Sequence, residues 1–425
     1  MANTRMSTTD GAIRRASGGR PVHATGAGVA EVGTPPEYRW VILSVLFVAR
    51  FSLGFQFQSV GSVGPFLIND FGLDYTQVGT LVGLYMLPGL IVALPSGMLG
   101  KRYGDKQMVM IGLCAMILGG AICGAATSYA TVSIGRIISG VGAAILAVLM
   151  NKMITDWFAD KELFIGMAIF IIGWPVGIAA AQATQSQLGQ TFGWSAVFYL
   201  TAMMLGVALV TVTALYRPAP IEELNVCAPS SRLSRNEIWL ICVVGALWMF
   251  LNCAYVVLLS FGPALIVERG RSLVEAGRIA SLMSWVFFFA LPLGGYLATR
   301  FKAPNHVMVA GLVGAALFGL LIPLTDWPHL TFALFGIAFA LATPVIGSLP
   351  SEALKPANRA TGLGIYYVWY YAGVASAPAV GGLLKDVTQT AAAPIHFATA
   401  MMFACLLLLG LFRLEQTRRR ITSDT

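Results

Sequence analysis

A single arginine stands inside an otherwise uncharged apolar stretch near the start of the chain. The stretch from Trp40 to Phe66 reads WVILSVLFVARFSLGFQFQSVGSVGPF, and Arg50 is its one charged residue. On a helix, Arg50 would lie about 15 Å from the start, near the centre of a hydrocarbon layer about 30 Å thick. An arginine stays protonated there, and its burial costs at least about 2.5 kcal/mol. We therefore expect a compensating partner, such as an anion held by the guanidinium fork.

Two residues share the helix face of Arg50. Gly54 and Gln58 follow it by four and eight positions. The glycine leaves room for a ligand or a neighbouring backbone, and Gln58 supplies amide donors and an acceptor. The alternative is a structural arginine that backbone carbonyls satisfy. We favour a fixed cation that faces a central cavity, because charged residues inside membrane spans are by default functional.

A second arginine, Arg136, lies roughly six residues into its own apolar segment, nearer the predicted outer face. Gly140, Ala143 and Ala147 follow it on one helix face, which indicates close packing against another helix. Arg136 can pin its segment to the first or second segment, or it can contact a substrate directly. The residues leave both roles open.

Acidic residues are missing from the middle of every apolar segment. We expect Asp70, Asp74, Glu162 and Glu352 to lie near segment ends, in contact with water. A carrier of the usual proton-coupled type needs a buried acid, and an exporter of cationic drugs needs one to hold the drug. We therefore predict that Arg50 meets an anionic substrate rather than a protein carboxylate.

Polar and aromatic residues of the second half of the chain can complete such a site. Trp248, Asn252 and Tyr255 lie in one segment, and Tyr366 and Tyr370 lie four apart in another. We predict that these residues contact the substrate, with phenolic hydroxyls donating to the anion. Tyr367 and Tyr371 form a second pair on the adjacent face. Packing is the alternative role for each aromatic residue.

Other polar residues at segment ends are given simpler roles. Gln182, Gln185 and Gln187 are expected only to mark the end of the fifth segment. Glu275 and Arg278 are three residues apart and are predicted to pair at the surface.

The composition is that of a membrane protein. The chain has 425 residues, of which 57% are hydrophobic and 11% are charged, whereas soluble domains carry about 25% charged residues. The six cysteines form no CxxC pair and the four histidines are scattered, so we expect neither a metal nor another cofactor. The chain has no phosphate-binding loop and no evident nucleophile with a base, which argues against an enzyme or an ATP-driven pump.

Twelve apolar segments can be marked, each long enough to cross a bilayer. We predict a cytoplasmic tail without structure over 1–38, a six-segment bundle over 39–216, a cytoplasmic loop over 217–236, a second bundle over 237–414 and a tail over 415–425. The segments span 40–66, 76–98, 107–128, 130–153, 163–187, 195–216, 237–266, 273–298, 306–325, 328–350, 360–384 and 393–413.

The positive charges predict the orientation of the chain. With both termini in the cytoplasm, the cytoplasmic tails and loops hold 21 of the 27 Lys and Arg residues, and the outer loops hold three. The net charge of +8 is thus a signal for lipid headgroups and not a nucleic-acid patch. We predict a multi-pass protein of the cell membrane, in keeping with a bacterial inner membrane, that acts as a monomer.

The two halves are related by an internal repeat. When residue i is placed against residue i + 198, Gly79 falls on Gly277, Gly97 on Gly295 and Arg102 on Arg300. Two parallel six-helix halves with a connecting loop place a substrate cavity between them, near the bilayer midplane.

With these features in place, the chain from 39 to 414 resembles the major facilitator superfamily. The loop GMLGKRYGDK is similar to the family signature G-x-x-x-[DE]-[RK]-x-G-x-[RK], with Lys101 where the family has an acid that latches the two halves together. Arg136, Gly140 and Gly142 resemble an R-x-x-x-G-x-G motif, and Pro175 with Gly177 resembles a G-P-x-x-G motif. In the signature loop, the matching residues are Gly97, Arg102, Gly104 and Lys106.

The resemblance implies an all-α membrane protein that works by alternating access. In the organic-anion branch of the family, arginines in segments one and four belong to the binding machinery. We therefore predict a secondary transporter for a small, anionic organic solute. The alternatives are an exporter of neutral or lipophilic compounds and a membrane receptor that does not transport.

Overall fold

The computed structural model describes residues 37–158, 162–219 and 233–423, apart from the side chains of residues 164, 360 and 419–423. The described residues form helices joined by short connections. The predicted tail lies outside them as far as residue 36, and so do residues 220–232 of the central loop. The first half contains α1 (Tyr38–Phe57), α2 (Ser59–Phe71), α3 (Tyr75–Leu84), α4 (Gly89–Tyr103), α5 (Asp105–Gly124), α6 (Tyr129–Phe158), α7 (Leu163–Phe192) and α8 (Trp194–Leu215).

The second half repeats this series of helices. Its final helix continues beyond residue 414, where the sequence predicts a tail. The helices are α9 (Arg235–Glu268), α10 (Leu273–Trp285), α11 (Phe287–Arg300), α12 (Pro304–Leu321), α13 (Pro328–Ala353), α14 (Arg359–Thr388) and α15 (Ala392–Ser423), with a 3-10 turn at Pro356–Asn358.

The described helices account for the twelve predicted segments, because three segments are each broken into two helices. The breaks separate α1 from α2, α3 from α4 and α10 from α11. Among the described residues, eleven continuous spans are long and apolar enough to cross a membrane. The remaining segment, the eleventh in chain order, is α14; it is not among them, since its tyrosines and glycines lower its hydropathy. The all-α fold is as predicted.

The breaks in the second and eighth segments occupy equivalent positions of the repeat. In the first half, the carbonyl of Gly83 accepts from both Met86 and Leu87, and Pro88 has no N–H to donate. Residue 88 corresponds to Val286, where α10 gives way to α11. The repeat therefore extends from the sequence to the local geometry of the helices.

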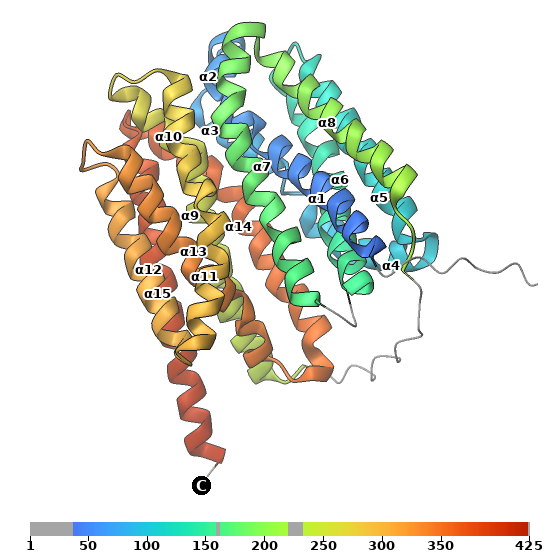
Figure 1. Cartoon of the computed structure of the whole chain (residues 1–425). Helices are drawn as coiled ribbons and strands as arrows, with labels where there is room; N and C mark the ends of the chain where they lie inside the picture. The colour runs from blue at the N-terminus through green and yellow to red at the C-terminus, as the bar shows by residue number, and fades with distance from the viewer. Residues whose placement is uncertain (1–36, 159–161, 220–232, 424–425) are drawn as a thin grey trace, which may run out of the picture. The chain divides into compact units, whose positions relative to one another are not determined.

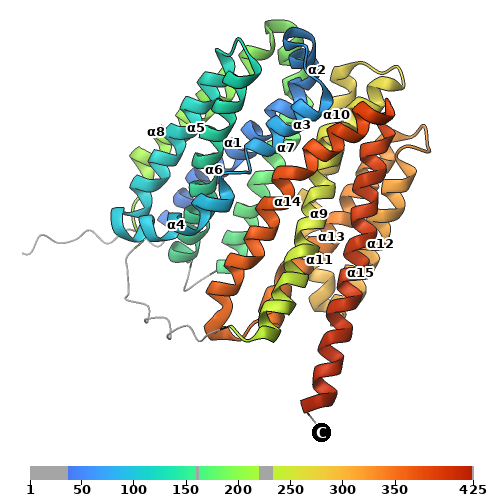
Figure 2. The same cartoon turned by 180° about the vertical axis from the view of Figure 1, so that it is seen from behind.

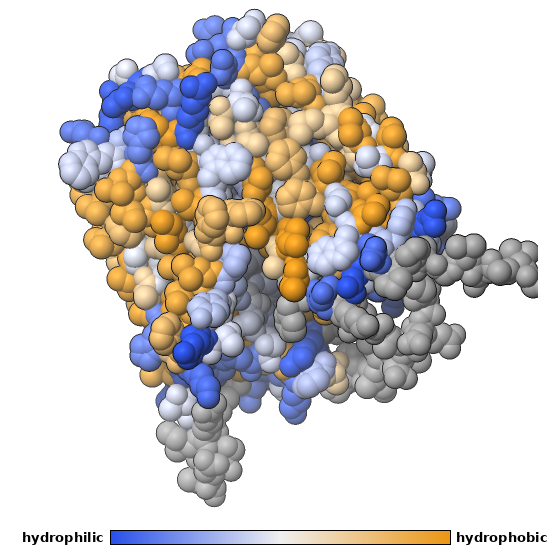
Figure 3. All heavy atoms as spheres, viewed as in Figure 1, coloured by the Kyte–Doolittle hydropathy of each residue, from blue (hydrophilic) through white to orange (hydrophobic). Residues whose placement is uncertain are grey.

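The described helices form two groups that lie against each other (Figures 1 and 2). The blue-to-green helices α1–α8 make one group, and the yellow-to-red helices α9–α15 make the other. A space-filling view shows apolar residues over the middle of one face, with hydrophilic residues gathered toward the two ends (Figure 3). This distribution suits a bilayer that surrounds the middle of the helices.

At the predicted inner end, ionic contacts tie each half to itself. Arg39, at the start of α1, pairs with Glu162 before α7 at 2.8 Å. The equivalent of Arg39 in the repeat is Glu237, at the start of α9. Its carboxylate accepts from the backbone N–H of Lys355 at 3.0 Å and from Asn358. In both halves, the first helix is thus bound to the connection that precedes the fifth segment.

At the predicted outer end, helices of the two halves cross closely at two places. α3 crosses α14 where Gly79 meets the carbonyl of Pro378, and α10 crosses α7 where Gly277 meets the carbonyl of Gln182. A Cβ atom on either glycine would overlap the carbonyl oxygen that it faces. The glycines that the repeat aligns are therefore the residues that let the halves close here.

Two expectations for polar residues at this end are wrong. Gln182 and Gln185 are fully buried rather than exposed at a helix end, and Gln182 donates to the carbonyl of Leu259 across the halves at 3.1 Å. Arg278 does not pair with Glu275; it donates to Gln187 of the other half at 2.8 Å. Glu275 pairs instead with Arg271, four residues before it, at 2.5 Å, and this leaves Arg278 to its partner across the interface.

We predict that side chains at the two crossing glycines hold the outer end apart. In Gly79→Val and Gly277→Val, spin labels on Asn69→Cys and Leu324→Cys, both exposed at this end, should report a longer distance by double electron–electron resonance. Gly206→Val is the matched control, since nothing lies within 4 Å of a Cβ there. An unchanged distance in both crossing variants would contradict the assignment of these contacts.

Candidate functional site

Arg50 lies where α1 meets α7 and the second half of the chain. Its guanidinium carbon stands 4.5 Å from the ring centroid of Phe170 on α7. It is close enough to interact electrostatically with Tyr367, Tyr370 and Tyr371 of α14. Among the described residues, no hydrogen bond or ion pair reaches its guanidinium, and Nε is buried without a partner. The cation thus keeps its hydrogen-bond donors unused.

Glycines on two helices fix the position of Arg50 relative to α7. Gly54 packs against the carbonyl of Trp174, and Gly177 packs against the carbonyl of Phe51. Each position would clash if it carried a Cβ atom, so α1 and α7 approach as closely as their backbones allow. The room beside Gly54 is filled by a neighbouring backbone, one of the two occupants that the sequence left open.

A row of tyrosines on α14 faces Arg50 from the second half. Tyr367 and Tyr370 have ring centroids 6.3 Å apart, and those of Tyr370 and Tyr371 are 5.0 Å apart. No hydrogen bond found among the described residues engages the hydroxyl groups of these tyrosines. The prediction selected the face with Tyr370 but assigned Tyr367 and Tyr371 no contact with substrate, whereas both lie within electrostatic reach of Arg50.

The other predicted contacts of the second half lie at different distances from Arg50. Trp248 stacks on Tyr366 at 5.8 Å, at the edge of the tyrosine row. Asn252 donates to the carbonyl of Trp248 in its own helix at 2.8 Å. Tyr255 is buried within the second half, where its hydroxyl meets Ser284 at 2.8 Å. The structure does not bring Tyr255 to the guanidinium of Arg50, and its contact with substrate stays a prediction.

Gln58 is buried at the break between α1 and α2, and its Nε2 has no hydrogen-bond partner among the described residues. It lies on α1 beyond Gly54, toward the predicted outer end. An unpaired amide donor inside a membrane protein is costly, which makes Gln58 available to a polar solute or to water.

Arg136 has the contacts of a structural arginine. It is fully buried, and its three nitrogens donate to the carbonyls of Leu81, Gln56 and Phe57 at 3.0, 3.3 and 3.2 Å. Its guanidinium also lies 4.4 Å from the ring centroid of Tyr85. It therefore pins α6 to the first and second segments, and contact of Arg136 with substrate stays a prediction without support from these distances.

The residues of the family motifs occupy packing and surface positions. Gly140 packs on the carbonyl of Tyr85 and Gly142 on that of Gly112, while Pro175 lies within α7 beside its crossing with α1. Lys106 binds the carbonyls that end α8, at 2.8 and 2.9 Å. The remaining signature residues lie at the inner end of α4, with the charged ones exposed; they are Gly97, Lys101, Arg102 and Gly104.

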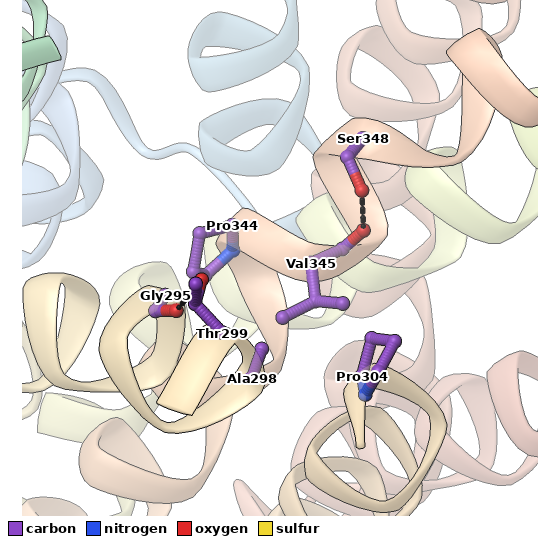
Figure 4. A pocket seen from close by; sticks show the side chains of 7 residues that line it. All are labelled: Gly295, Ala298, Thr299, Pro304, Pro344, Val345 and Ser348. Atoms are coloured by element: carbon purple, nitrogen blue, oxygen red, sulfur yellow. Dashed lines mark hydrogen bonds between the residues drawn. The ribbon is translucent and has the colours of Figure 1, made fainter. Parts of the chain in front are cut away.

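A cavity of about 320 Å³ lies in the second half, away from Arg50 (Figure 4). It is lined by residues of α11, α12 and α13. The hydroxyls of Thr299 and Ser348 point into their own helices and donate to the carbonyls of Gly295 and Val345 at 2.9 and 2.7 Å. Since its hydroxyl groups are already engaged, this cavity lacks the unused donors found beside Arg50.

Twelve apolar segments in two repeat-related halves, with an arginine that has no hydrogen-bond or ionic partner among the described residues, are the features of a membrane carrier. The sequence matches the Major Facilitator Superfamily over residues 46–277 and 243–424. The chain belongs to this family, whose members are secondary transporters and not enzymes. It is accordingly a multi-pass membrane protein that moves a small molecule.

Individual relatives are distant in sequence. The chain is 22% identical to the 4-hydroxybenzoate transporter PcaK of Acinetobacter baylyi over 371 residues, which cover 77% of this chain and 80% of PcaK. It is 24% identical to the probable nitrate/nitrite transporter NarK2 of Mycobacterium tuberculosis, over 78% of this chain and 84% of NarK2. Among solved structures, the nucleoside transporter NupG matches with a TM-score of 0.71 and 14% identity, over 89% and 99% of the two chains.

Phe170 is a site residue that sequence reasoning missed. It lies three positions before Gly173, whose Cβ position would be 3.5 Å from the Cβ of Arg50. Its position three residues before the G-P-x-x-G-like motif places Phe170 on the same face of α7 as Gly173. The sequence alone could not show that α1 packs against this face.

We predict that the two arginines differ in their effect on stability. Arg136→Met removes three hydrogen bonds and leaves buried carbonyls unpaired, so the free energy of unfolding should fall by about 3 kcal/mol. Arg50→Met removes no hydrogen bond and should leave thermal unfolding in detergent unchanged or shifted upward. Equal losses in the two variants would show that Arg50 is also structural.

Proposed function

We propose that this carrier transports a small organic anion that binds to the guanidinium of Arg50. The observation that carries the proposal is the absence, among the described residues, of any hydrogen bond or ion pair to this partly buried cation. A charge in a low-dielectric site attracts an opposite charge strongly, so a carboxylate is the natural occupant. The site joins α1 and α7 of one half to α14 of the other, as a substrate site between two moving halves must.

The side chains around Arg50 favour an anion with an apolar body. Phe170 offers a ring face, and the tyrosines of α14 offer rings together with unengaged hydroxyls. A carboxylate can take two N–H bonds from Arg50 and one O–H bond from a tyrosine. The relatives PcaK and NarK2 are named as transporters of anions, which supports the proposed charge of the substrate.

The positive charges and the helix crossings together suggest which side of the carrier is closed. If the termini lie in the cytoplasm, the crossings at Gly79 and Gly277 seal the outer side. The conformation is then inward-facing. The bundles proposed at 39–216 and 237–414 would rock about the Arg50 site, and the substrate would leave when water competes for the cation.

We predict that Arg50→Ala abolishes anion uptake. Reconstituted in liposomes, the wild type should exchange one of benzoate, 4-hydroxybenzoate or nitrate in counterflow, and the variant should lose at least about 95% of this exchange because the cation that binds the anion is gone. Arg235→Ala, which changes an exposed residue at the start of α9, is the control for insertion and folding. Transport of benzamide but of no acid would instead identify an exporter of neutral compounds.

We predict that Tyr367→Phe weakens anion binding without removing it. Loss of one hydroxyl that donates to a charged group should raise the Kd about tenfold, measured by ligand-induced thermal shift. Tyr296→Phe, on the exposed surface of α11, should bind as the wild type does. If Tyr367→Phe also binds like the wild type, Arg50 acts without this hydroxyl.

A further inference from the structure

The N-terminus of α3 has two carboxylates, one from each half of the protein. The first N–H groups of a helix have no partner within that helix. Asp74, which precedes α3, accepts from the N–H of Gln77 at 2.7 Å and forms a capping box with it. The N–H groups of Tyr75 and Thr76 remain, and neither can reach Asp74 in the same geometry.

Asp386 of α14 binds both remaining donors from the opposite half. Its Oδ1 accepts from the N–H of Tyr75 at 3.0 Å, and its Oδ2 accepts from the N–H of Thr76 at 2.8 Å. The hydroxyl of Thr76 donates to the same Oδ2 at 2.6 Å. One carboxylate thus completes the cap of a helix that lies 310 residues away in the chain.

The position of Asp386 on its own helix is unfavourable. It lies in the last turn of α14, which ends at Thr388, where carbonyl groups point toward an anion. The neighbouring Lys385 is engaged elsewhere: it pairs with Glu268 of α9 and stands 4.4 Å from the ring centroid of Tyr75. The contact with α3 therefore gives the Asp386 carboxylate the N–H donors that the last turn of α14 does not offer.

The repeat shows that the packing of the halves does not require this contact. The equivalent helix end in the second half, the start of α10, is capped from its own half by Ser272. The residue that corresponds to Asp386 is Leu188, which cannot cap a helix. The crossing of α10 with α7 therefore closes without a carboxylate from the other half.

We propose that Asp386 is the latch of the outer end. Its carboxylate caps α3 from the opposite half and holds α3 against α14 in the closed state, and these hydrogen bonds break when this end opens. On opening, the donors of Tyr75 and Thr76 pass to water, and Asp386 is left at the unfavourable end of its own helix. Both effects favour reclosure. The latch belongs to the conformational cycle of the carrier and does not depend on which substrate Arg50 binds.

The test measures the opening of the outer end directly. The full-length protein, with its six cysteines replaced by serine, carries spin labels on Asn69→Cys and Leu324→Cys in lipid nanodiscs. Double electron–electron resonance then gives the fraction of molecules with the longer, open distance. In Asp386→Ala, this fraction should rise about tenfold relative to the closed one, as loss of charge-assisted hydrogen bonds predicts.

Asp74→Ala is the matched control, because it removes the other carboxylate from the same helix end without touching the contact between halves. It should leave the open fraction unchanged. A distance distribution like that of the wild type in Asp386→Ala overturns the proposal, and so does an equal shift in both variants, which would report fraying of α3 alone. If Asp386→Ala does not insert into the membrane, the same measurement is made on Asp386→Asn, whose side chain keeps one of the two acceptor oxygens but loses the charge. A rise in its open fraction supports the proposal, and a distribution like that of the wild type overturns it.

Discussion

The position of Arg136 reflects the constraint that governs any chain in a bilayer, where each backbone polar group needs a partner inside the protein. The first and second membrane segments are broken, and carbonyls near both breaks accept hydrogen bonds from this one side chain. α6 thereby fixes α1, α2 and α3 in one arrangement. The direction of α1, and with it the place of Arg50, depends on this anchor.

The two intramembrane arginines show how context decides the role of the same side chain. Arg136 donates its hydrogen bonds to carbonyls of the protein, and its guanidinium lies over the ring of Tyr85. The guanidinium of Arg50 also lies over a ring, that of Phe170, but it donates no hydrogen bond to any described residue. A protein gains nothing in stability from a partly buried cation without a partner, which agrees with the proposed role of Arg50 in binding an anion.

The periodicity of the sequence was sufficient to predict the fold and to single out Arg50 as a candidate, but it was insufficient to predict the partners across the interface. Apolar length and charge bias predicted the twelve segments, and the repeat pointed to Gly79 and Gly277 before their contacts were known. The helix period also assigns the tyrosines of α14 to two faces, but it cannot say which of these faces lies toward Arg50 until the position of α1 is known. The partners of Arg278 and Asp386 lie in the opposite half, beyond the reach of any rule based on local spacing.

The contacts at the inner end have a consequence for how the chain is made. Arg39 finds its carboxylate at Glu162, whereas Glu237 finds its donors at Lys355 and Asn358, so equivalent positions carry opposite charge. Each first helix finds these partners within its own half. The first half can therefore complete its inner end during synthesis, before the second half has left the ribosome.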